Sequence, residues 1–167
     1  MGDDANHSIS AHLESFIHRT LKPDDTILEL GSGAGTLRLC EDYRVFSVEH
    51  DKKWLARSPA TYIYAPIAPF RKPCADFPDD TGWYDRDVLR RELPHDYRLI
   101  LVDGPPNFIG RGGFYKWREL FRFDVPVIID DIHRERERKM IGLLSKELRR
   151  PYTVYAWERR HFGVILP

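Results

Sequence analysis

The chain has 167 residues, 42% of them hydrophobic, which suits one globular domain over residues 1–167 and excludes a disordered chain. Its 26 basic and 26 acidic residues cancel, so the overall charge carries no nucleic-acid signature and no attraction to an anionic membrane. No apolar run predicts a membrane span, the polar start does not resemble a signal peptide, and two cysteines are too few for a disulfide framework. We therefore expect a cytoplasmic protein.

Short apolar segments that end at polar residues predict the strands of a sheet. Ahead of them, apolar side chains recur at helical spacing over residues 10–21 and predict an amphipathic helix. The predicted strands are, in chain order, TILEL (26–30), RVFSV ending at Glu49, TYIYA (61–65), YRLILV ending at Asp103, and VPVII ending at Asp130 and Asp131. They show little polar alternation, which is typical of parallel strands that helices cover on both faces.

Further helices and a final pair of strands complete the predicted fold. A short helix over residues 36–42 and a long amphipathic helix over 132–149 alternate with the strands, which indicates a doubly wound α/β fold with a mostly parallel sheet. Only three residues join YTVYAW (152–157) to HFGVIL (161–166), so these two segments predict an antiparallel hairpin.

Two segments do not fit this alternation. Residues 65–84 hold four prolines, exceed an ordinary connection in length, and are expected to lack regular structure. Residues 107–113, NFIGRGG, are expected to form a flexible turn ahead of a helix in FYKWRELF (114–121). Because long loops beside the strand ends of such folds often carry function, both segments are candidates to close a binding site.

The stretch TILELGSGAGTLRL places three alternating glycines directly after the first predicted strand. Glycines at such a turn let the backbone approach a ligand closely. A phosphate-binding P-loop needs a lysine that is absent here, and a dinucleotide loop that starts at Gly31 needs a glycine where Thr36 stands. The loop therefore predicts a ligand that neither phosphate motif describes.

The loop does match the pattern Glu29-x-Gly31-x-Gly33-x-Gly35. This pattern resembles the first motif of class I S-adenosylmethionine-dependent methyltransferases, E/D-x-G-x-G-x-G, and it stands at the corresponding place after the first strand. The resemblance covers the chain from about residue 26 to its end. It implies a Rossmann-like, seven-stranded sheet that ends in an antiparallel hairpin, S-adenosylmethionine as cofactor, and methyltransferase activity.

The resemblance also implies which residues hold the cofactor. Glu49 closes the second strand, where a carboxylate that accepts hydrogen bonds from a ribose diol belongs. His50 and Ala65 fall where the family contacts the adenine, and Glu29 would support the loop and help to receive the ammonium group. The complete set of expected cofactor residues is Glu29, Gly31, Ser32, Gly33, Gly35, Glu49, His50, Ala65 and Asp103.

Acidic residues after the fourth and fifth strands indicate an oxygen acceptor. Amino-group methyltransferases carry a polar residue, then two prolines, then an aromatic residue. In VDGPPN, a glycine separates Asp103 from the prolines and no aromatic residue directly follows them, so the sequence does not match that motif. A hydroxyl acceptor needs a base or a Lewis acid, and the candidate catalytic residues are Asp103, Asp131 and His133. We expect the acceptor to be a small molecule or a sugar.

Asp103, Asp130 and Asp131 also form a candidate magnesium site, because Mg²⁺ prefers a few hard carboxylates. The layout resembles catechol-type O-methyltransferases, which place an acid after strand four and an Asp-Asn pair after strand five. This chain departs from that pattern with Asp-Asp and with Gly-Pro-Pro after Asp103. In the metal-free alternative, Asp131 caps the following helix, Asp130 is a strand-end acid, and Asp103 orients the proline turn or contacts the transferring methyl region.

Substrate contacts are expected from the two segments outside the alternation. Arg111 is a candidate clamp for a carboxylate or phosphate, and Phe108 is a candidate wall of the pocket. Two of five aromatic residues are expected to touch substrate, the five being Phe70, Trp83, Tyr84, Phe108 and Phe114. These segments, or the second subunit of a homodimer, would close the site over a small acceptor.

Two other functions stay open. A nicotinamide-binding oxidoreductase would bind NAD, although Thr36 stands where its loop needs a third glycine. A methyltransferase-like binding protein would bind the cofactor and transfer nothing, and no residue of the sequence separates it from an active enzyme.

Overall fold

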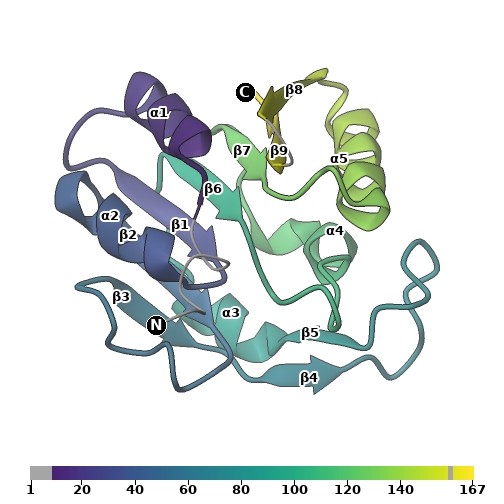
Figure 1. Cartoon of the computed structure of the whole chain (residues 1–167). Coiled ribbons are helices and arrows are strands. Elements are labelled where there is room, and N and C mark those ends of the chain that lie inside the picture. The colour runs from purple at the N-terminus through teal and green to yellow at the C-terminus, as the bar shows by residue number, and fades with distance from the viewer. Residues whose placement is uncertain (1–8, 158–159) are drawn as a thin grey trace.

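The computed structural model describes residues 9–157 and 160–167 and contains a seven-stranded sheet in the order β3-β2-β1-β6-β7-β9-β8 (Figure 1). The strands of this sheet are β1 Thr26–Leu30, β2 Arg44–Glu49, β3 Thr61–Tyr64, β6 Leu99–Val102, β7 Val127–Ile129, β8 Tyr152–Trp157 and β9 Arg160–Ile165. A separate two-stranded sheet is formed by β4 Ile67–Pro69 and β5 Gly82–Tyr84. The helices are α1 Ala11–Thr20, α2 Ala34–Asp42, α3 Arg86–Glu92, α4 Gly113–Lys116 and α5 Glu135–Leu148, with a 3₁₀ turn, η2, at Arg118–Leu120.

The directions of the strands confirm the predicted fold class. Strands β3, β2, β1, β6 and β7 pair in parallel, whereas β9 runs antiparallel to both β7 and β8. The register places Glu29 of β1 beside Ser47 of β2. The carboxyl ends of the parallel strands therefore meet at one edge of the sheet, and the residues that follow them are brought together there.

Both faces of the sheet are buried, which explains the continuous apolar runs of its central strands. Figure 1 shows α1 and α2 on one side of the sheet and α4 and α5 on the other. The face under α1 and α2 includes Leu13, Ile17, Ile27, Leu39, Val45, Leu99, Leu101 and Ile128. The opposite face includes Leu28, Leu30, Ile100, Val102, Ile129, Leu89 of α3, Phe114 of α4, and Met140 and Ile141 of α5.

The long C-terminal helix begins at Glu135, three residues later than predicted. Asp131 has a left-handed backbone with φ of 61°, and the Arg134 N–H donates to the Asp131 carbonyl at 2.8 Å, so residues 131–134 form a turn. The residue that precedes the first helical turn is Arg134. The expectation that Asp131 caps this helix is therefore wrong.

The two segments that the sequence left without regular structure pack on each other. Residues 65–84, which we call the proline segment, contain the β4–β5 hairpin; the prediction of no regular structure is wrong here, since both strands of such a pair are edge strands and tolerate proline. Residues 107–113, which we call the glycine turn, are buried from residue 109 onward. A Cβ atom would overlap Asp80 at Gly110, Phe77 at Gly112 and Trp83 at Gly113. These glycines provide space for packing, which corrects the prediction of a flexible turn.

Asp80 fixes this packing with hydrogen bonds. Its side chain is fully buried; one carboxylate oxygen accepts the Gly112 N–H at 2.6 Å and the other accepts from Arg136 Nη1 at 3.0 Å. The Thr81 N–H donates to the Ile109 carbonyl at 2.9 Å. The proline segment therefore determines where the glycine turn lies beside the sheet.

Among residues 9–157 and 160–167, no helix is both long enough and apolar enough to cross a membrane.

Candidate functional site

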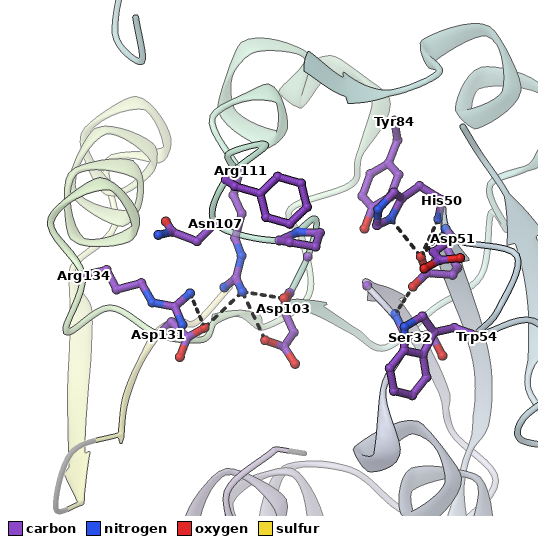
Figure 2. A pocket seen from close by; sticks show the side chains of 15 residues that line it. Ser32, His50, Asp51, Trp54, Tyr84, Asp103, Asn107, Arg111, Asp131 and Arg134 are labelled. Carbon is purple, nitrogen blue, oxygen red and sulfur yellow. Dashed lines mark hydrogen bonds and ion pairs between the residues drawn. The ribbon is translucent and has the colours of Figure 1, made fainter. Parts of the chain in front are cut away.

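A cavity of about 390 Å³ lies at the carboxyl ends of β1, β2, β6 and β7, the edge at which open α/β sheets bind ligands. It is lined by Gly31, Ser32, Glu49, His50, Asp51, Trp54, Tyr84, Asp103, Gly104, Pro106, Asn107, Phe108, Arg111, Asp131 and Arg134. Figure 2 shows two groups of these side chains facing each other. We call the lining residues 31–54 the glycine-loop side and the lining residues 103–134 the Arg111 side; Tyr84 comes from β5.

The loop after β1 is shaped by close backbone contacts. Gly31 has φ of 97°, a conformation that favours glycine, and a Cβ atom on it would lie 2.6 Å from the Gly104 Cα. The Gly31 N–H donates to the Val48 carbonyl at 2.9 Å. The Gly33 N–H donates to Thr36 Oγ1 at 2.9 Å, so a threonine takes part in the turn at the position where a dinucleotide loop would have its third glycine.

The Glu49 carboxylate lies on the cavity wall and is bound by three backbone N–H groups. One oxygen accepts from Ser32 at 2.9 Å, and the other accepts from His50 at 2.6 Å and Asp51 at 2.7 Å. His50 Nδ1 lies 2.8 Å from the second oxygen. A carboxylate offers about four lone-pair positions, so Glu49 retains capacity to accept a hydroxyl of a ligand.

Glu29 lies beneath the loop and is not part of the cavity lining. Its carboxylate accepts from Thr36 Oγ1 at 2.8 Å and from Ser47 Oγ at 2.5 Å, and the residue is 1% exposed. Burial raises the pKa of Glu29 to about 7, against the opposing effect of the Ser47 and Thr36 hydrogen bonds. The hydrogen bond to Thr36 is compatible with a role of Glu29 as a support of the loop, and contact with the cofactor's ammonium group stays a prediction.

Three other expected cofactor residues also lie away from the cavity lining. Gly33 takes part in the turn with Thr36, and Gly35 packs against Ile9, just ahead of α1, where a Cβ atom would collide. Ala65 is fully buried, and its N–H donates to the Glu49 carbonyl at 2.9 Å. The expected residues that do line the cavity are Gly31, Ser32, Glu49, His50 and Asp103.

Arg111 is 5% exposed and binds the ends of two strands (Figure 2). Its Nη2 donates to the Asp103 carbonyl at 2.5 Å and to Asp131 Oδ2 at 3.1 Å, and lies 3.3 Å from Asp103 Oδ1. Nη1 donates to the Asp130 carbonyl at 3.2 Å, and Nε to the Pro105 carbonyl at 3.3 Å. Every nitrogen of the guanidinium thus has a protein acceptor, which argues against the expected substrate clamp.

The residues of the candidate magnesium site do not fit a metal ion. The Arg111 guanidinium occupies the position between the Asp103 and Asp131 carboxylates that a cation would take. Asp130 Oδ1 accepts the Asp131 N–H at 2.8 Å, and Asp130 is outside the cavity lining. Within the part of the chain that the structure describes, no group of three or more His, Cys, Asp or Glu side chains is arranged to hold a metal.

Asp103 is a cavity-lining carboxyl with a strongly raised pKa. Burial raises the pKa of its carboxyl well above the usual range, Asp130 adds to the rise, and Arg111 opposes it. Burial and Asp131 likewise raise the pKa of Asp130 to about 6. Asp103 therefore holds a proton more tightly than an ordinary aspartate does, which makes it a candidate for proton transfer in the cavity.

The remaining predicted residues separate into two groups. His133 is exposed, lies with its ring centroid 6.1 Å from that of His161, and is not among the cavity-lining residues, so the expected catalytic role is not supported. Phe108, 77% exposed, lines the cavity as expected. Of the five candidate aromatic residues, two line it, Phe108 and Tyr84.

Sequence reasoning missed three polar residues and one aromatic residue of the lining: Asp51, Asn107, Arg134 and Trp54. Arg134 Nη1 lies 2.8 Å from Asp131 Oδ2 at the rim of the Arg111 side. The available signal was position alone, because these residues closely follow Glu49, Asp103 and Asp131 at strand ends. Trp54 lies five residues after β2 ends, a distance at which no motif specifies a contact.

Comparisons with known proteins identify the fold. No protein-family model matches the sequence, and no curated protein sequence matches it significantly. Solved structures do match. Podospora anserina methyltransferase PaMTH1, with S-adenosylhomocysteine bound, is 15% identical with a TM-score of 0.60, and the match covers 99% of this chain and 82% of that one. The fold is that of the class I methyltransferases.

Two further matches have this methyltransferase fold. A proposed caffeoyl-CoA O-methyltransferase from Staphylococcus aureus is 12% identical with a TM-score of 0.57, and the match covers 98% of this chain and 87% of that one. The 16S rRNA N2 methyltransferase RsmC from T. thermophilus is 13% identical with a TM-score of 0.56, covering 95% of this chain and 39% of that one. Their names differ in acceptor, so the fold alone does not identify an acceptor for this chain.

Proposed function

We propose that this protein is an S-adenosylmethionine-dependent methyltransferase that methylates an oxygen of a small molecule or a sugar. The observation that carries the proposal is the convergence of the glycine loop, Glu49 and Asp103 on one cavity at the carboxyl edge of a methyltransferase-type sheet. A cavity with a free acceptor on one side and a perturbed carboxyl on the other suits a ligand with a ribose and a reaction that releases a proton.

The glycine-loop side suits the nucleoside part of the cofactor. Glu49 is held rigidly by three N–H groups and keeps a lone pair for a ribose hydroxyl. Asp51 lines the same side and provides a second carboxylate for a diol. His50 and Trp54 supply flat surfaces beside it, which are suited to contact with an adenine.

The Arg111 side suits the acceptor. When bound, S-adenosylmethionine supplies a methyl group on a sulfonium, so accurate positioning of the acceptor carries much of the rate. The Asp103 carboxylate would accept the proton that the acceptor hydroxyl loses as it takes up that methyl group. Arg111 keeps Asp103 in place and balances its charge. Phe108 and Arg134 at the rim offer an apolar surface and a cation to the rest of the acceptor.

The test of the cofactor is calorimetric titration of the protein with S-adenosylhomocysteine. We expect binding by the wild type and an affinity about tenfold to a hundredfold lower in Glu49→Gln, because a hydrogen bond to a charged acceptor is lost. The matched control is Glu92→Gln, whose exposed side chain pairs with Arg91 outside the cavity. Absence of heat with the wild type contradicts the proposal, and binding of NAD instead would favour an oxidoreductase.

The test of the activity is transfer of a labelled methyl group to panels of hydroxyl-bearing small molecules and sugars. Because Arg111 occupies the place of a metal ion, we expect turnover to persist in the presence of a chelator. Loss of turnover with chelator and its recovery with magnesium would contradict the metal-free step. Cofactor binding without transfer to any acceptor class would favour the catalytically inactive binding protein.

A further inference from the structure

Tyr84 presents a buried hydroxyl without a hydrogen-bond partner at the cavity. The residue is fully buried and lines the cavity, and among the described residues no donor or acceptor pairs with its hydroxyl. Figure 2 shows its side chain extending from β5 to a position beside His50. A buried polar group without a partner is uncommon because its desolvation is not compensated, so this hydroxyl requires an explanation.

The backbone and ring contacts of Tyr84 place the hydroxyl where the two sides of the cavity meet. A Cβ atom on Gly104 would lie 2.6 Å from the hydroxyl oxygen and 2.6 Å from the Gly31 Cα. The Tyr84 ring lies at 6.2 Å from the His50 ring and at 4.9 Å from the Trp83 ring, both edge to face. The hydroxyl is thus adjacent to both loops that cross below the cavity, and Gly31, His50 and Gly104 around it all line that cavity.

The charges around the hydroxyl make it a hydrogen-bond donor. Burial raises the pKa of Tyr84 well above its ordinary value, and the nearby Glu49 adds to the rise while Arg111 opposes it. The phenol therefore stays protonated. A neutral phenol between the carboxylate-rich glycine-loop side and Asp103 is suited to donate to an oxygen of a ligand.

The hairpin that carries Tyr84 is fixed on both flanks. The Asp85 N–H donates to the Pro66 carbonyl at 2.8 Å, and the Ala65 N–H donates to the Glu49 carbonyl at 2.9 Å. Trp83 fills the space above Gly113. This geometry holds the hydroxyl in position before any ligand binds, which reduces the entropy cost of using it.

We propose that Tyr84 is a cofactor-binding residue whose hydroxyl donates a hydrogen bond to an oxygen of S-adenosylmethionine, either on the ribose or on the carboxylate of the amino-acid tail. The inference rests on the proposed function and adds to it a residue from the proline segment, outside the glycine loop and the strands of the seven-stranded sheet. If the hydroxyl binds the ligand and does not stabilise the fold, its removal should weaken ligand binding without lowering the stability of the ligand-free protein.

The test is Tyr84→Phe, measured for ligand affinity and for stability without ligand. We expect S-adenosylhomocysteine to bind about fivefold to tenfold more weakly, the loss of one hydrogen bond. We expect the unfolding temperature of the ligand-free variant to be equal to or above that of the wild type, because an unpaired hydroxyl has been removed. Titration with 5′-methylthioadenosine, which has the ribose and lacks the tail, assigns the oxygen: weaker binding of both ligands indicates the ribose, and of S-adenosylhomocysteine alone the carboxylate.

Tyr97→Phe is the matched control. Tyr97 is equally buried, but its hydroxyl accepts the Arg122 N–H at 2.7 Å and it does not line this cavity. This variant should lose stability and keep the wild-type affinity. The inference is overturned if folded Tyr84→Phe binds both ligands like the wild type, or if it is destabilised as Tyr97→Phe is. Binding by the wild type with no change in Tyr84→Phe rejects the inference alone, whereas absence of binding by the wild type rejects the proposed function as well.

Discussion

The two sides of the cavity are held together by different kinds of contact. On the glycine-loop side, hydrogen bonds join the loop and the two strands that flank it: Ser32 donates to Glu49, and beneath the loop Thr36 and Ser47 donate to Glu29. On the Arg111 side, one guanidinium joins the ends of β6 and β7, and its turn is held by a carboxylate 32 residues earlier in the chain.

This difference explains why the residues of the glycine-loop side could be predicted from the sequence better than those of the Arg111 side. A strand, a tight turn and a helix form a continuous unit, so its glycine spacing and its two carboxylates occur within a short stretch. Packing between distant segments leaves no such pattern. The three experiments below test whether the Arg111 side depends on distant contacts and the glycine-loop side on local ones.

The largest effect is expected from removing the buried cation of the Arg111 side. Arg111→Met leaves Asp103, Asp131 and Glu137 without their shared positive partner. We expect a loss of about 3 to 5 kcal/mol in the free energy of unfolding at pH 8, because breaking a buried ion pair leaves uncompensated charge. At pH 5 the loss should be smaller, since carboxyl groups with raised pKa values can then be protonated.

Urea unfolding at both pH values measures this effect. Arg118→Met is the control, because Arg118 pairs with the half-exposed Glu147 at 2.7 Å and such pairs contribute about 1 kcal/mol or less. Equal losses in the two variants would show that the Arg111 side does not depend on its central arginine.

A smaller effect is expected from Glu29, which lies beneath the loop of the glycine-loop side. The folded-state pKa of about 7 exceeds the ordinary value of 4.5, so the folded protein holds this proton more tightly than the unfolded chain does. The resulting stabilisation is complete below pH 4.5 and is lost as the pH rises through about 7. A shift of this size corresponds to about 2 to 3 kcal/mol between pH 5 and pH 8.

Glu29→Gln has no such titration. As the pH rises from 5 to 8, the unfolding free energy of the wild type should therefore fall by this amount relative to that of the variant. Asp130, whose pKa is also raised, is present in both proteins and cancels in the comparison. A constant difference between the two proteins from pH 5 to pH 8 would contradict the assignment of Glu29 as a buried, proton-binding support of the loop.

The smallest of the three effects is expected in the glycine turn. Gly112→Ala forces a methyl group against Phe77 and should cost about 2 kcal/mol of stability. Gly142→Ala is the matched control, since a methyl group there meets nothing within 4 Å and Gly142 lies inside α5. That substitution should stabilise the protein by about 0.5 to 1 kcal/mol. A similar response of the two variants in thermal unfolding would show that the glycine turn is flexible after all.

The mostly parallel sheet, its C-terminal hairpin and the position of Glu49 at a strand end followed from the sequence, because buried strands and strand-end residues have clear patterns. His133 did not: the helix begins three residues later than its periodicity indicates, and the intervening turn directs Arg134 to the cavity instead. Arg111 was expected to bind substrate, but its acceptors are mostly backbone carbonyls, which every residue possesses. The glycine turn was expected to be flexible because glycine spacing does not reveal which distant side chains fill the space.

The packing of Phe77, Asp80 and Trp83 against three glycines has a consequence for how this protein can diverge. A larger residue in the glycine turn requires a smaller one in the proline segment, and the reverse. A single substitution therefore lowers stability, whereas two compensating substitutions can be tolerated. Among homologues of this chain, we therefore expect positions 77 and 112 to covary, and also positions 83 and 113. If the protein has the function proposed above, changes in the glycine turn that alter the cavity lining would then occur in paired steps.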